Sequence, residues 1–506
     1  MRAHLRDGST VVLPKGGTVS RADLSGEGQR YPLLSDMPAH ALRPLTVPMD
    51  SVIGVETFEG HVQKGQTVVA TAATTVVGAA AAWGLFIAIF GSCPTIYADT
   101  GAHALPAAEG FSYAISPWFE QRDLDPISVP VDSRGVVRLE LRNEALETHF
   151  LTHLSLAAVT HGANEVVAPD QRNAPVAVSA LRPPLRAVDR DGRDVRALLV
   201  HADDSVYAST ATRIANARAG DLEDWITVDT EELPPGDSVA VVLRLRNSLL
   251  NTVLLYDGIM GGPDALDWMS RGTTHVSKLL GLAAWYRRTM GLRATVGAVD
   301  DSESSLADTA ARRGMARLGD VGPIAFRDVA IVLPRPTASA TRVRVRVRFV
   351  VDNWRIDQLR VGGAVRRPDV TSVPVARVIV PTPVGGGPAM EDTAARRMLQ
   401  ATDSQYLETR PGQRLRLEFL APGAVPRHGE LRAGSARVPG DSLTQYLIAW
   451  SGWYREWLRS AWLSNPVRRQ TPFVPGDSAV LDALQRWQAQ RVEFERAFRT
   501  TRLPVR

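Results

Sequence analysis

A run of 34 residues without a formal charge, 65–98, constrains what this chain can fold into more than any other feature. Its central part reads TVVATAATTVVGAAAAWGLFIAIFG, residues 67–91, and the second half of that stretch is strongly apolar. A helix of ~20 apolar residues crosses the hydrocarbon core of a bilayer. The run therefore predicts one transmembrane helix over residues 65–92, through which the chain contacts the lipid bilayer.

Two other interpretations of this run stay open. The first is a buried core helix. The second is a late signal sequence, because Phe90-Gly91-Ser92-Cys93 resembles a bacterial lipobox and makes Cys93 a candidate for lipidation. Phe is a poor residue at the first lipobox position, and the run begins much later than a signal peptide does. A transmembrane helix is therefore the interpretation that we favour.

The charges on either side of the run predict its orientation. Lys64 precedes it directly, whereas the first basic residue after it is Arg122. Basic residues favour the cytoplasmic side of a membrane. We expect a protein of the bacterial inner membrane, with residues 1–62 in the cytoplasm and residues 93–506 in the periplasm.

Small residues inside the run indicate contact with a partner helix. Gly78 and Ala82, and likewise Ala80 and Gly84, are separated by three residues, a spacing that lets two helices approach closely in lipid. We take Gly78, Ala82 and Gly84 as candidates for helix packing. An alanine-rich composition without any partner explains the same pattern.

Composition narrows the remaining classes of protein. Apolar residues make up 44% and charged residues 22% of the 506, so the chain can bury a core. A single cysteine excludes a disulfide framework and a cysteine-based metal cluster. The net charge of +4 is too small for a general nucleic-acid binder, so no nucleic-acid partner is expected. The 40 Gly and 33 Pro favour a turn-rich, strand-rich protein.

Strand-like alternation predicts a mainly β fold on both sides of the run. In residues 341–350, valines and Phe349 alternate with arginines, which predicts a strand with an apolar inner face and a basic outer face. We expect a small N-terminal β unit, one transmembrane helix, two antiparallel β-sandwich or jelly-roll-like units with helical insertions, and a C-terminal helical tail. The expected order is a small β domain (1–62), the transmembrane helix (65–92), β domain 1 (93–262), a helical insertion (263–318), β domain 2 (319–440) and the tail (441–506).

An internal repeat supports two related β units. VVRLELRNEALET, residues 136–148, matches AVVLRLRNSLLNT, residues 240–252, at a constant offset of 104 residues. The two stretches share an Arg-Asn-x-x-Leu-x-Thr ending, which is more specific than alternating Val and Leu. Leu141 and Leu245 align and are both expected in a core.

The last 80 residues are basic and rich in tryptophan. Residues 427–506 hold 13 Arg and 7 acidic residues, a net charge of +6. Trp450, Trp453 and Trp457 follow the i, i+3, i+7 spacing of one helical face. This face has three interpretations: a core stripe on the β domain, a docking surface for a partner, or a segment at an anionic lipid surface. The candidate partner-binding residues are Trp450, Trp453, Trp457, Arg455, Arg459 and Arg491.

No motif for catalysis, a cofactor or a metal stands out. The chain has no GxSxG elbow, phosphate-binding loop or dinucleotide fingerprint. His149 and His153 are spaced i, i+4, but on a strand this places them about 13 Å apart, too far to share one ion. We therefore expect no enzyme, no cofactor, no metal and no small-molecule substrate.

Several stretches resemble a family of uncharacterised bacterial membrane-anchored, β-rich envelope proteins. The resemblance rests on Ser-Cys-Pro-x-x-Tyr at 92–97 directly after the membrane segment, RNEALETH at 142–149, VDNWRIDQ at 351–358 and GWYREW at 452–457. It implies no activity and no active-site residue. The whole arrangement also resembles an accessory, non-pigmented subunit of a bacterial photosynthetic reaction centre–light-harvesting complex.

These features favour a non-catalytic, single-pass membrane protein that binds and stabilises the other membrane-protein subunits of a complex. The alternative is an envelope lipoprotein-like carbohydrate-binding module or hydrolase on a jelly-roll scaffold, in which tryptophans stack on sugars. The positions of Trp354, Trp450 and Trp453 distinguish the two. Exposure in a groove beside carboxylates favours a glycan site, and burial in a core favours a scaffold.

Overall fold

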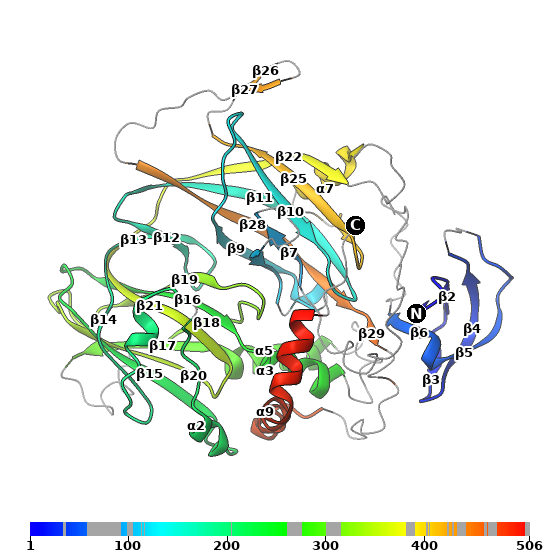
Figure 1. The fold of residues 1–506 in the computed structure, drawn as a ribbon, viewed down its shortest axis with the longest axis horizontal. Helices are drawn as coiled ribbons and strands as arrows, with labels where there is room; N and C mark the ends of the chain where they lie inside the picture. Colours follow the sequence, from blue (N-terminus) through cyan, green and yellow to red (C-terminus); the bar gives the residue numbers. More distant parts are fainter. Residues whose placement is uncertain are drawn as a thin grey trace.

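The structure is a computed structural model. It describes residues 1–33, 37–57, 93–98, 105–112, 114–115, 117–203, 205–260, 276–299, 315–380, 390–400, 403, 405–422, 425–427, 430–432, 442–459, 463 and 473–500. The fold is mainly β, as the sequence predicts (Figure 1). Among the described residues, the strands of every sheet pair in antiparallel fashion.

A ten-stranded sheet combines the strands that follow residue 93 with those that follow residue 370. Its order is β8 (Pro106–Glu109), β7 (Thr95–Tyr97), β10 (Val136–Arg142), β25 (Arg414–Leu420), β22 (Val370–Val380), β11 (Glu147–Gly162), β28 (Ser442–Glu456) and β9 (Gln121–Ile127). Two short strands extend it: β23 (Met390–Glu391) pairs with β22, and β24 (Leu407–Thr409) pairs with β11.

A β-sandwich of two five-stranded sheets is inserted between β11 and β22. The sheet that we call the inner sheet has the order β12 (Val166–Pro169), β13 (Pro175–Arg182), β21 (Trp354–Arg366), β16 (Ser238–Asn247) and β19 (Arg327–Pro334). The outer sheet has the order β14 (Pro184–Asp189), β15 (Glu223–Thr230), β20 (Val343–Val350), β17 (Leu292–Ala298) and β18 (Ala316–Leu318). The inner sheet contacts the ten-stranded sheet, because Val167 and Ala177 share a core with Leu124, Ala157 and Leu447.

The N-terminal strands form a third structure, a seven-stranded sheet. Its order is β29 (Leu458–Arg459), β6 (Val52–Glu56), β1 (Arg2–Leu5), β2 (Thr10–Val12), β4 (Asp23–Tyr31) and β3 (Thr18–Val19), with β5 (Arg43–Pro48) paired to β4. A short 3-10 helix, η1 (Met49–Ser51), joins β5 to β6. The small N-terminal β unit is therefore present, and its sheet includes a strand from the C-terminal part of the chain.

The remaining described elements are helices and one hairpin. They are η2 (Pro117–Phe119), α1 (Ala197–Val200), α2 (Ala211–Ala215), α3 (Leu250–Val253), the π-helical η3 (Leu254–Met260), α5 (Val276–Met290), α7 (Thr393–Gln400), α9 (Asp477–Thr500) and the hairpin of β26 (Val425–Arg427) and β27 (Glu430–Arg432). Helix α9 lies beside α3 and α5 at one end of the sandwich (Figure 1).

The strands divide differently from the expected domains. The sandwich takes β16 from the expected β domain 1 and β19, β20 and β21 from the expected β domain 2, and β17 lies within the expected helical insertion. The sandwich is therefore one packed unit that extends across the domain boundaries expected at residues 262 and 319. Sequence periodicity identifies strands but not their partners, and here the partners are distant in the chain.

The expected helix at the start of the tail is wrong. Residues 442–456 form β28, which pairs with β11 along its whole length. Strand geometry turns successive side chains to opposite faces, so Trp450 and Trp453 lie on opposite sides of the sheet instead of on one stripe. Aromatic and β-branched residues dominate YLIAW and favour a strand, whereas the helical spacing of the tryptophans is coincidental.

The repeat has a local structural counterpart only. Leu141 and Leu245 are both buried, in the core of the ten-stranded sheet and in the core of the sandwich, respectively. Asn143 and Asn247 follow them and are both fully buried and hydrogen-bonded to backbone groups. Beyond this point β10 leads into the long strand β11, whereas β16 leads into α3. The match describes how two strands end, not a duplicated fold.

The expected transmembrane helix, residues 65–92, lies outside the described residues, and so do Gly78, Ala82 and Gly84. Within the described ranges, no helix has both the length and the apolar character needed to cross a membrane.

Candidate functional site

Several predicted site residues meet at a buried junction between the ten-stranded sheet and the N-terminal sheet. Strand β11 begins at Glu147, β28 ends at Glu456, and Arg459 follows on β29. The π-helical η3 adds Tyr256, whose hydroxyl donates to Glu456 Oε2 at 3.0 Å. Arg459 donates through a terminal guanidinium nitrogen to Glu456 Oε1 at 2.9 Å. We call these four residues, together with Cys93 and Tyr454, the junction cluster.

Two carboxyl groups of the junction cluster lie against each other out of water. Glu147 is fully buried and Glu456 is 1% exposed. Burial raises the pKa of Glu147 to about 8 even though Arg459 opposes the shift. Burial, together with the nearby charge of Glu147, also raises the pKa of Glu456 well above its usual range. At neutral pH the pair therefore holds a proton, which is the expected state when like charges cannot both ionise.

Cys93, the candidate for lipidation, is buried in this cluster. Its side chain packs in the core of the ten-stranded sheet. Burial and the neighbouring carboxylate of Glu109 raise the pKa of its thiol well above the usual value. Reactive thiols are exposed and have a lowered pKa. The environment of Cys93 is therefore that of a core thiol, and its lipidation stays a prediction.

A second set of contacts fastens the N-terminal sheet to this junction. Trp457 donates its indole N–H to Thr148 Oγ1 at 2.9 Å, and that hydroxyl donates to Glu56 Oε1 at 3.0 Å. Arg2 and His4 contact the other oxygen of Glu56. Burial alone would raise the pKa of Glu56, but the hydrogen bond from His4 and the charge of Arg2 lower it to about 2. Glu56 is therefore ionised, unlike the neighbouring pair of Glu147 and Glu456, which holds a proton.

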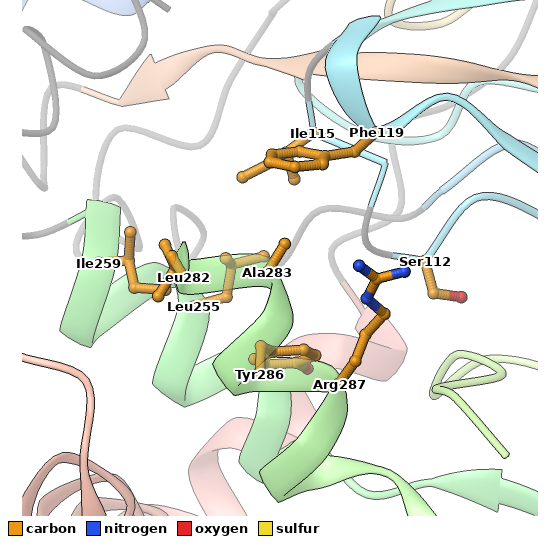
Figure 2. A pocket seen from close by; sticks show the side chains of 9 residues that line it. All are labelled: Ser112, Ile115, Phe119, Leu255, Ile259, Leu282, Ala283, Tyr286 and Arg287. Atoms are coloured by element: carbon orange, nitrogen blue, oxygen red, sulfur yellow. The ribbon is translucent and has the colours of Figure 1, made fainter. Parts of the chain in front are cut away.

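A small cavity lies next to the junction cluster. Figure 2 shows Ile115 and Phe119 on one side of the cavity and the lining residues of η3 and α5 on the other. The guanidinium of Arg287 extends toward Ser112. The lining is Ser112, Ile115, Phe119, Leu255, Ile259, Leu282, Ala283, Tyr286 and Arg287. Its volume is about 40 Å³. This is room for two or three waters, far less than the several hundred cubic ångströms of a typical ligand pocket.

The predicted tryptophan stripe is part of the protein interior. Trp450 is fully buried and donates its indole N–H to Asp125 Oδ2 at 2.9 Å. Trp453 is 5% exposed and stacks on Phe150 with ring centroids 4.0 Å apart. Trp457 is equally buried. The structure therefore places these three residues in a core and not together on a surface.

The three candidate arginines are also separated. Arg455 lies over the rings of Trp453 and Phe150, and Arg459 is buried in the junction cluster. Arg491 lies far along the chain on α9, where it pairs with Glu495 and lies over Trp487. Helix α9 itself is docked within the chain, since the indole N–H of Trp487 donates to Asp352 Oδ2 at 2.6 Å.

The histidines do not form a site. His149 contacts Glu147 and Thr409, whereas His153 contacts Ser155. Across the residues that the structure describes, no group of three or more His, Cys, Asp or Glu is arranged to hold a metal ion.

Sequence reasoning missed the paired carboxyl groups of Glu147 and Glu456. They lie 309 positions apart in the numbering and meet because β11 pairs with β28 from Glu147↔Glu456 onward. The signal in the sequence is a glutamate at the first residue of one strand and at the last residue of another, and it does not indicate that the two strands pair.

No model of a protein family matches the chain, and no curated protein sequence matches it. Among solved structures, the crystal structure of a GH31 alpha-xylosidase from Xanthomonas citri is similar at 12% sequence identity and a TM-score of 0.15, covering 63% of this chain. The matched region spans 28% of that enzyme. A likeness at this level carries no argument about fold or activity.

Proposed function

We propose that the chain is a non-catalytic subunit that binds and holds other proteins in a membrane-associated complex of the bacterial envelope. The single observation that carries the proposal is the burial of the three tryptophans that distinguish a scaffold from a glycan site. Trp354 and Trp450 are fully buried, and Trp453 is 5% exposed. A sugar-binding tryptophan presents its ring face to solvent, and none of these three does.

The ionisable groups support the same proposal. Glu147, Glu456 and Asp125 are buried beside arginines or aromatic hydroxyl and indole groups of the same chain. Such groups join sheets to one another and fix their relative positions. Rigid sheets with fixed side chains are suited to presenting a surface to a partner.

Anchoring through residues 65–92 and the photosynthetic complex that the resemblance implies stay predictions. The pairing of β29 with β6 limits how any anchor is arranged. Hydrogen-bonded strands lie on the same side of a membrane, so a single crossing between residues 57 and 93 does not fit this pairing. We therefore propose that residues 1–57 share a side with residues 93–459, in place of the single crossing and the opposite sides expected from the sequence.

The test is purification of the full-length chain from its native membrane in mild detergent. The proposal predicts partner proteins in fixed stoichiometry. Binding to a glycan array or release of sugar from cell-wall glycan, with no co-purifying protein, contradicts it and supports the carbohydrate alternative.

A further inference from the structure

The outer sheet of the sandwich has a basic face that points away from the inner sheet. Alternation of side chains places Val343, Val345 and Val347 in the sandwich core. The residues between them, and those directly opposite on neighbouring strands, therefore lie on the other face. The charged residues at these positions are Arg186 on β14, Glu223 and Asp229 on β15, Arg344, Arg346 and Arg348 on β20, Arg293 on β17 and Arg317 on β18.

This face, which we call the arginine face, holds six arginines and two acids, a net charge of +4. Five of the six arginines reach solvent, whereas Arg346 is buried. The two acids are each shared between arginines. Asp229 accepts from Arg344 through both oxygens, at 2.6 and 3.0 Å, and lies 3.7 Å from Arg186. Glu223 lies 2.8 Å from Arg293 and 3.8 Å from Arg348. Positive charge is therefore in excess across the face.

One row of the arginine face is costly to the fold. Arg348 lies directly opposite Arg293, and Arg293 lies directly opposite Arg317, so three arginines are aligned across β20, β17 and β18. Like charges directly opposite each other destabilise an antiparallel sheet. Arg317 is exposed and pairs with no acid among the described residues. Glu223 offsets this cost at Arg293 and Arg348, which are half-buried, but not at Arg317. An exposed arginine that is left without an acid beside two others indicates a use in binding.

The chemistry of the face favours carboxylates as its ligands. The contacts of Asp229 and Glu223 show that carboxylates fit between these guanidinium groups. Trp225, the aromatic residue in the same row, is not free to enter lipid or to stack on a base, because the guanidinium groups of Arg190 and Arg346 lie over its ring, 4.7 and 5.5 Å from its centroid. A basic sheet surface whose aromatic residue is covered by guanidinium groups matches an acidic protein surface better than a membrane or a nucleic acid.

We propose that the arginine face docks a partner protein through a surface rich in Asp and Glu, which contacts the row of Arg348, Arg293 and Arg317 that runs from β20 to the edge strand β18. This inference rests on the proposed function and names the surface that performs it.

The test uses the full-length protein in detergent and a fluorescent peptide of ten glutamates as the probe. Arg317→Glu is the test variant, and Arg397→Glu, at an exposed position on α7, is the matched control. We expect Arg317→Glu to weaken peptide binding at least tenfold while raising the melting temperature, because it replaces a like-charged neighbour of Arg293 with an opposite one. Arg397→Glu should leave the affinity unchanged.

Three outcomes overturn the proposal: equal loss of binding in both variants, unchanged binding in Arg317→Glu, or tighter binding of heparin or of anionic phosphatidylglycerol vesicles than of the peptide. The first means general electrostatic attraction, and the last means a different class of ligand. Native purification of the same variants separates this inference from the proposed function. Partners retained by Arg317→Glu leave the proposed function standing and remove the arginine face from it.

Discussion

The imidazole of His4 lies flat against the indole of Trp457, with ring centroids 3.9 Å apart and an angle of 6° between the planes. The two residues belong to the first strand of the chain and to the segment after β28, so the contact joins the beginning of the chain to its C-terminal part. Gly54 on β6 leaves room for it, because a Cβ atom there would lie 3.1 Å from the Cβ of Trp457.

This contact predicts that both parts lie on one side of any membrane. Cysteine probes at two exposed positions, Asp50→Cys and Ser205→Cys, are placed separately in a Cys93→Ser background. In intact cells, a membrane-impermeant maleimide should either label both variants or neither. Labelling of one in intact cells and of the other only after lysis would separate the two parts and disprove the contact.

The buried carboxyl pair predicts an unusual dependence of stability on pH. The pKa of Glu147 is raised to about 8, whereas an unfolded glutamate titrates near its ordinary value of 4.5. Between these values the unfolded chain releases a proton that the native protein keeps, so the free energy of unfolding falls by at most about 1.4 kcal/mol for each pH unit. Above about pH 8, Glu147 is ionised in both the folded and the unfolded state and lowers the free energy of unfolding no further.

The substitution Glu147→Gln removes the titrating carboxyl group and with it this dependence of the free energy of unfolding on pH. Denaturant unfolding should show the variant close to the wild type at pH 4.5 and more stable than it at pH 8. Glu232→Gln, at an exposed position, is the control and should follow the wild type. A parallel pH profile for Glu147→Gln and the wild type would mean that Glu147 is ionised in the folded protein.

The burial of the two aligned leucines of the repeat predicts that truncating either one lowers the free energy of unfolding by a similar amount. Leu141 and Leu245 are 1% and 0% exposed, so Leu→Ala at either should lower the free energy of unfolding by about 2–5 kcal/mol. Leu443→Ala, at a position that is 52% exposed, should change it by less than about 0.5 kcal/mol. Calorimetry of the three variants provides the measurement, and small effects at the two buried positions would place the strands outside the cores.

Helix α9 predicts that the tail is needed for folding. Trp487 is 1% exposed and packs with Phe494 against the end of the sandwich. Trp487→Ala should cost about 3–5 kcal/mol of stability in the same unfolding measurement. Val492→Ala, on the exposed side of α9, should be close to neutral. If Trp487→Ala leaves stability unchanged, the helix is not docked.

Local sequence patterns predicted much of the fold. The alternation of Val343, Val345 and Val347 with arginines predicted the correct strand and the correct inner face. The expected helical insertion contains α5, and the expected helical tail contains α9. The tryptophan spacing failed at β28, because three aromatic residues fit a helical period by chance when the neighbours favour a strand.

The arrangement of the sheets and the junction cluster could not be predicted. Both depend on pairing between distant segments, such as β11 with β28 and β6 with β29. Alternation defines which face of a strand is apolar but carries no information about its neighbour. Glu147 and Glu456 are ordinary glutamates in the sequence, and only the pairing of their strands makes them a buried, proton-sharing pair.

Native mass spectrometry of the full-length protein purified from its own membrane tests whether this chain is a binding subunit. We expect one dominant assembly with partner proteins in fixed stoichiometry, which dissociates as the salt concentration rises because charges at an exposed face are screened. A single species with the mass of this chain alone, at both low and high salt, would contradict it.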